Sequence, residues 1–65
     1  MKRKELKNLA EKIAKAELIC SSSTSTEKEK AAARQEIEKL TSHVDSFEDM
    51  IVIDELVQDL LEKKS

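Results

Sequence analysis

The sequence predicts an all-α protein, and three features of its composition lead to that prediction. The 65 residues include no Gly and no Pro, and Phe47 is the only aromatic residue. β-Sheets need turn residues that accept a positive φ, and they favour aromatic or β-branched side chains; both kinds of residue are scarce here. Ala, Leu, Glu, Lys, Gln and Arg dominate instead, and these residues are strong helix formers. We therefore expect helices joined by short connections.

The length of the chain allows one domain at most, with a core that is small for a stable monomer. Small domains are usually stabilised further by disulfides, bound metals or oligomerisation. Cys20 is the only cysteine, so no intramolecular disulfide can form, and the one histidine cannot build a zinc site with it. We expect residues 1–65 to form a single small helical domain that assembles into an oligomeric helical bundle, as a dimer or a tetramer.

The first predicted helix covers residues 3–20, RKELKNLAEKIAKAELIC. Apolar residues recur in it at steps of three and four. They are Leu6, Leu9, Ala10, Ile13, Ala16 and Cys20. These residues form one narrow stripe, which we expect to contact one neighbouring helix.

Residues 21–26, SSSTST, are the only low-complexity segment and are expected to connect two helices. Short hydroxyl side chains compete for backbone hydrogen bonds and therefore favour caps and turns over helix interiors. Two capping boxes overlap at the end of the segment, Thr24 with Glu27 and Thr26 with Glu29, so a second helix should start near residue 25 or 27. The alternative is that the segment serves as a phosphorylation site or a flexible hinge.

The second helix is expected over about residues 26–44. Its apolar side carries Ala33, Ile37, Leu40 and Val44. Further along the chain the apolar pattern rotates by roughly a third of a turn, so either one long helix continues or the helix breaks near 43–46. Ser46, followed by Asp49, is the pattern of a new N-cap. We favour the break, which gives a three-helix chain with a last helix over about 46–63; the alternative is a helical hairpin.

The stretch from 47 to 61, FEDMIVIDELVQDLL, is the most apolar part of the chain, and we expect the rest to be organised around it. Its apolar residues cover more than one side of a helical wheel, so the helix needs partners from its own chain, a second copy or another protein. Within the expected interface, an inner core comprises Met50, Ile53, Val57, Leu60 and Leu61. The residues expected to face a second copy or another protein are Phe47, Ile51 and Leu56.

Charge is divided unevenly along the chain. Residues 1–20 carry six Lys or Arg against three Glu, whereas residues 46–65 carry two Lys against six acidic residues. The basic first helix and the acidic last helix should therefore attract each other, within a chain or between copies. Asp54 falls between apolar residues on the helical wheel. We expect its carboxylate to pair with a cation of the first helix, such as Lys12, or to enter an interface.

The chemically reactive residues do not form the pattern of an enzyme. Cys20 and His43, the only thiol and the only imidazole, fall at opposite ends of different helices, where they cannot act as nucleophile and base. Cys20 is expected to be a small buried hydrophobe, and His43 to lie at a helix end. There is no Glu-x-x-His motif and no EF-hand spacing. We therefore predict no catalytic residue, no metal site and no cofactor.

Lys2, Arg3 and Lys4 are the feature that points toward nucleic acid, because clustered cations contact phosphates. The lack of aromatic residues for base stacking and the net charge of −2 count against this function. A small nucleic-acid-binding regulator is therefore the alternative function. No segment has the pattern of a signal peptide or a membrane span, so we expect a cytoplasmic protein without membrane contact.

The segments KELKNLAEKIAKAE (4–17) and FEDMIVIDELVQDLLEKK (47–64) resemble small, highly charged helical proteins encoded by phages and prophages of Gram-positive bacteria. The resemblance covers most of the chain and rests on length and sequence style, so it transfers no binding or catalytic residue. It implies an accessory protein that regulates or inhibits a host or defence protein through direct contact. The expected function is thus a non-enzymatic, self-associating protein–protein interaction module.

Overall fold

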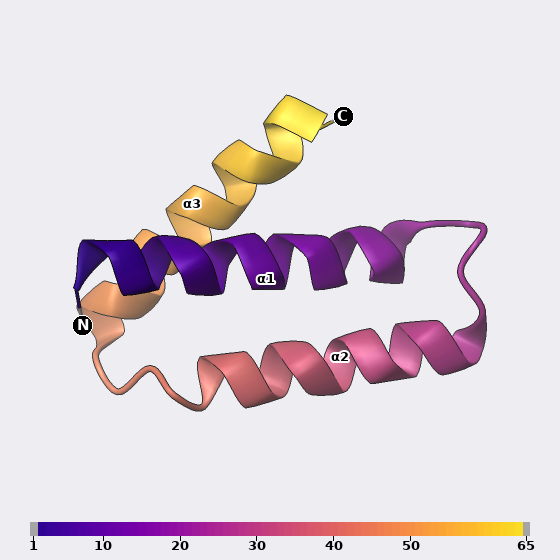
Figure 1. Ribbon diagram of the computed structural model, residues 1–65, viewed down its shortest axis with the longest axis horizontal. Coiled ribbons are helices and arrows are strands. Elements are labelled where there is room, and N and C mark those ends of the chain that lie inside the picture. The colour runs from indigo at the N-terminus through magenta and orange to yellow at the C-terminus, as the bar shows by residue number, and fades with distance from the viewer. Residues whose placement is uncertain (1, 65) are drawn as a thin grey trace.

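The computed structural model describes residues 2–64, which form three α-helices (Figure 1). Helix α1 covers Arg3–Ser21, α2 covers Glu27–Thr41 and α3 covers Phe47–Lys64. The described residues contain no strand, so the predicted all-α class is confirmed. The chain leaves helical geometry between α2 and α3, which confirms three helices instead of a hairpin.

The Ser/Thr segment connects α1 to α2, and its last residue caps the second helix. The backbone N–H of Glu29 donates to the Thr26 hydroxyl at 3.1 Å, and the backbone N–H of Thr26 donates to the Glu29 carboxylate at 3.3 Å. This is a complete capping box, in which two backbone donors without a partner inside the helix are satisfied reciprocally. Only the second of the two overlapping boxes forms, because Thr24 is hydrogen-bonded to Ser22 within the turn.

The break between α2 and α3 is held by hydrogen bonds at both of its ends. The Ser42 hydroxyl donates to the carbonyl oxygen of Lys39 at 2.7 Å, which satisfies an acceptor left open at the end of α2. The first backbone bond of α3 runs from the N–H of Met50 to the carbonyl oxygen of Ser46 at 3.1 Å. Ser46 therefore occupies the N-cap position that was predicted for it.

Helix α1 is the central element of the fold. It packs against both of the other helices, whereas α2 and α3 barely touch each other. In Figure 1, α2 returns antiparallel beside α1, and α3 crosses behind α1 obliquely. Of the nine buried apolar residues in the described chain, α1 contributes five: Leu6, Ala10, Ile13, Ala14 and Ala16.

The expectation that α1 contacts a single neighbour is therefore wrong. Its apolar face is broadened by Ala14, which lies outside the predicted stripe but is buried. Three of its five buried residues are alanines, and small side chains let neighbouring helices approach closely on two adjacent sides. The most apolar helix, α3, is thus a peripheral element with one intramolecular neighbour, and it does not organise the fold.

The open arrangement of the helices is reflected in the dimensions of the molecule. The Cα radius of gyration is 11.9 Å, slightly above the ~11 Å expected for a compact domain of this length. Buried residues from all three helices nevertheless share one core, to which α2 contributes Leu40 and α3 contributes Ile53 and Val57. Within residues 2–64, no helix has the length and apolar character that a membrane span requires.

Candidate interaction surface

Helix α3 buries one side against α1. Ile53 and Val57 are each only 2% exposed and belong to the common core, while Leu60 and Leu61 are partly buried against it. Met50 was expected in this inner core, but 37% of its surface is exposed. It lies about 60° from Ile53 around the helix, so its side chain sits at the margin of the contact with α1.

The three residues expected to face a partner differ in how much of their side chains is exposed. Leu56 is packed against the core and only partly open, because it lies about 60° from Ile53 on the other margin of the contact. Phe47 and Ile51, by contrast, are 79% and 45% exposed. Of the three residues expected to face a partner, Phe47 and Ile51 are therefore open at the surface.

Phe47, Met50 and Ile51 form a continuous apolar strip on the first turns of α3. At about 100° per residue the three side chains fall within an arc of about 100°, which begins at the margin of the core and ends on the solvent side. Isolated apolar residues are common on protein surfaces, but contiguous ones mark contact sites. The apolar strip is therefore the clearest candidate for protein contact on this helix.

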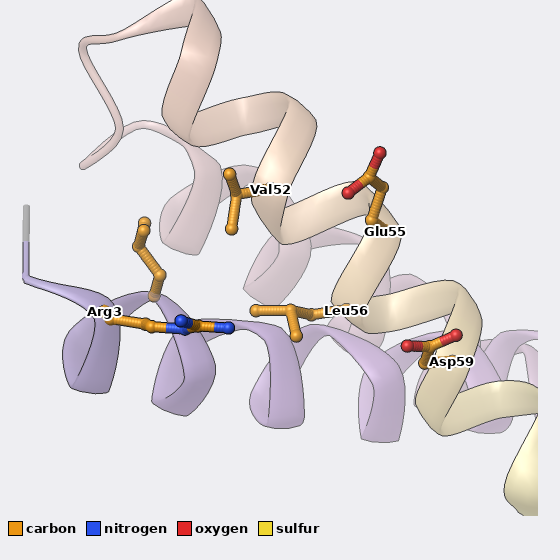
Figure 2. Close-up of a pocket in the computed structure, with 6 residues that line it drawn as sticks. Arg3, Val52, Glu55, Leu56 and Asp59 are labelled. Carbon is orange, nitrogen blue, oxygen red and sulfur yellow. The ribbon is translucent and has the colours of Figure 1, made fainter.

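A groove opens on the other flank of α3, where this helix crosses the start of α1 (Figure 2). This α1–α3 groove encloses a hollow of about 580 Å³. It is lined by Arg3, Leu6, Val52, Glu55, Leu56 and Asp59. Figure 2 shows Val52 and Leu56 facing the space between the helices, beside Arg3, so that the floor of the groove is apolar and its edges are charged.

The two banks of the groove carry opposite charges. Arg3 lies on the α1 bank, and Glu55 and Asp59 lie on the α3 bank. All three are exposed, and the described part of the chain forms no ion pair between Arg3 and either carboxylate. Lys2 and Lys4, the other two cations expected to make charged contacts, are also exposed at the start of α1.

Asp54 does not form the predicted ion pair with Lys12. It is exposed and lines a shallow hollow with Glu55, Gln58 and Asp59 of its own helix. Lys12 instead borders a hollow between α1 and α2. The prediction fails because Asp54 lies at the outer margin of the contact with α1, about 60° from the buried Val57 and about 100° from Ile53 around α3, where its side chain is exposed. Its entry into an interface stays a prediction.

The structure keeps Cys20 and His43 apart. The Cys20 thiol, which is partly buried and not fully buried as expected, donates a hydrogen bond to the carbonyl oxygen of Lys30 at 3.7 Å. This bond joins the end of α1 to the start of α2. His43 is exposed just beyond α2. No group of three or more His, Cys, Asp or Glu residues able to hold a metal ion occurs in the described chain.

The groove was not apparent from the sequence. On a helical wheel, Glu55 and Asp59 fall on the polar side of α3 and Val52 beside them, but the wheel contains no information on where Arg3 lies. A signal was present in Val52 and Leu56, which are four residues apart and alternate with the two carboxylates. Comparisons with models of protein families, with curated protein sequences and with solved structures found no match.

Proposed function

We propose that this chain is a non-enzymatic protein–protein interaction module that self-associates through the apolar strip of Phe47, Met50 and Ile51. One observation carries the proposal: the strip extends the apolar face of α3 from the core out to solvent, where no described residue covers it. A helix with one intramolecular neighbour and this much open apolar surface gains stability from a second neighbour.

The size of the strip sets the strength of the contact that it can make. Burying a large apolar side chain contributes about 2 kcal/mol, so the exposed fractions of the three residues correspond to about 3 kcal/mol per copy. Two copies would gain about 6 kcal/mol, which is comparable with the lower bound of ~4 kcal/mol for lost translational and rotational freedom. The strip alone would therefore form a weak dimer, and a stable assembly would need a further contact.

In this proposal the protein works in the cytoplasm as a small accessory factor, and assembly leaves its charged faces available to a target. The resemblance of residues 4–17 and 47–64 to small phage and prophage proteins supports a regulator or an inhibitor of a host or defence protein. The target is then a protein, and α3 offers it an acidic outer face that includes Glu48.

Sedimentation equilibrium, with far-UV circular dichroism on the same samples, tests the proposal. Ile51→Asp places a charge in the strip at a position that is already exposed, so the monomer should stay helical while the average mass falls. Gln35→Asp adds the same charge to the exposed face of α2 and should leave the mass unchanged. A helical Ile51→Asp variant with the wild-type mass, or a wild-type chain that stays monomeric at high concentration, would refute self-association through the strip.

The exposed cations Lys2, Arg3 and Lys4 favour a second candidate function, the binding of nucleic acid. Against it stand Glu55 and Asp59, which border the same groove as Arg3 and would repel phosphates. Binding of a duplex or a single strand that weakens steeply with salt, and that is lost when all three cations are replaced by alanine, would establish this alternative.

A further inference from the structure

We infer that the α1–α3 groove is a second self-docking site, in which the groove of one copy is covered by the groove of another across a two-fold axis. This inference rests on the proposed self-association and adds to it a separate surface with its own residues. The occupant is a second copy of this chain, and three features of the groove lead to it.

The first feature is the division of charge between the two banks. Arg3 stands on the α1 bank, whereas Glu55 and Asp59 stand on the α3 bank. A two-fold rotation about an axis that runs along the groove brings the α1 bank of one copy opposite the α3 bank of the other, and it does so twice in the same interface. The groove is therefore complementary to itself, and orientations that bring like charges together are disfavoured.

The second feature is that the charges of the two banks do not pair with each other across the groove of one copy. The described chain forms no ion pair between Arg3 and the carboxylates of the opposite bank. An arginine side chain can donate two parallel hydrogen bonds to one carboxylate, and such a pair is stronger than one between neutral groups. The start of α1 adds the positive end of the helix dipole, so a carboxylate from a second copy is stabilised there by the helix as well.

The third feature is the apolar floor between the banks. Val52 is 37% exposed, and Leu56 is partly open on the same side of α3. An apolar centre surrounded by a charged rim is the usual anatomy of a protein interface. In the two-fold arrangement, the apolar floors of the two copies face each other, and the paired banks shield both floors from water.

The groove and the apolar strip engage different copies. Val52 lies about 100° from Ile51 around α3, and the strip continues from Ile51 away from the groove. One neighbour therefore contacts the strip and another contacts the groove. Two self-complementary surfaces on one chain give a closed tetramer with dihedral symmetry when their two-fold axes cross at right angles. For that arrangement we expect sedimentation equilibrium of the wild-type chain to give four times the monomer mass.

Charge exchange tests the groove. In Arg3→Glu the α1 bank becomes acidic, and in the double variant Glu55→Arg/Asp59→Arg the α3 bank becomes basic. Each variant alone brings like charges together twice in the interface, so we expect each to sediment at half the wild-type mass, as a dimer held by the strip. An equimolar mixture brings opposite charges together at both contacts and should restore the tetramer.

A matched control and the strip variant distinguish a failure of the groove from a failure of the strip. Lys15→Glu reverses a charge on the exposed side of α1 that faces away from the groove and should leave the mass unchanged. Wild-type mass in either groove variant, or a mixture that stays dimeric, would overturn the groove assignment while leaving the strip intact. If Ile51→Asp keeps the wild-type mass and the groove variants sediment as monomers, the strip is wrong and the groove stands.

Discussion

Two isoleucines of α3, two residues apart, provide a direct test of the distinction between its core side and its contact side. Ile53 is 2% exposed and Ile51 is 45% exposed, although both lie in the first half of the same helix. Replacing either one with alanine deletes the same atoms and changes helix propensity by the same amount. A difference in stability between the two variants therefore reflects how deeply each isoleucine side chain is buried.

The structure gives the size of the expected difference. Ile53→Ala removes side-chain atoms from a closed part of the core, for which the loss of unfolding free energy is about 2–5 kcal/mol. Ile51→Ala removes a half-exposed side chain, and the better helix propensity of alanine offsets part of that loss, so the monomer should change by less than about 1 kcal/mol. A domain of this size has only about 3–5 kcal/mol in total, so Ile53→Ala should unfold a large share of the molecules.

Urea denaturation followed by circular dichroism at several protein concentrations separates the two effects. Ile53→Ala should lower the midpoint at every concentration, whereas Ile51→Ala should mainly reduce the rise of the midpoint with concentration, because it weakens association. Ile53→Val, with an expected loss of about 0.5–1.5 kcal/mol, gives a milder version in case the alanine variant is largely unfolded. Equal losses in Ile51→Ala and Ile53→Ala at low concentration would refute the assignment of core and contact sides.

Three further predictions follow from the caps and charges. Thr26→Ala removes the capping box with Glu29 and should lower the free energy of unfolding, measured by urea denaturation, by about 1 kcal/mol. Thr24→Ala, within the turn, should lower it clearly less. Equal losses in the two variants would contradict the cap assignment. Raising the salt concentration to about 1 M shortens the Debye length to about 3 Å and should shift the wild-type tetramer toward the dimer in sedimentation equilibrium. Arg3→Glu, already dimeric, should not show that shift, and a salt-insensitive wild type would argue against charge pairing in the groove. Asp54→Asn should leave the urea midpoint of the isolated chain within about 0.5 kcal/mol of wild type, because the carboxylate has no partner in α1; a larger loss would indicate an ion pair.

The helix boundaries were largely predictable from the sequence, because they are decided by local chemistry. Thr26 and Glu29 are three residues apart, and their reciprocal hydrogen bonds involve only that turn of the chain. Serine is a favoured N-cap residue, and Ser46 stands at the start of α3, where its carbonyl oxygen accepts the first helical hydrogen bond. The absence of glycine and proline, together with strong helix formers elsewhere, then sufficed for the fold class.

The arrangement of the helices was not predictable in the same way, because it depends on how faces from distant parts of the chain meet. A helical wheel shows which residues share a side, but it does not show at which angle two helices cross. The buried Ala14 widened the face of α1 and gave it two neighbours. The oblique crossing of α3 then placed Arg3 beside Leu56 and left Asp54 without the cation that the charge pattern had suggested.

The near absence of contact between α2 and α3 has a consequence for local unfolding. Each of these helices depends on α1 and neither depends on the other, so the loss of one interface leaves the second intact. In a monomer, α3 can separate from α1 as a unit while the antiparallel pair of α1 and α2 stays folded. Amide hydrogens of α3 should then exchange with solvent through this partial opening, and faster than those in the middle of α1, which become exposed only when both interfaces are lost.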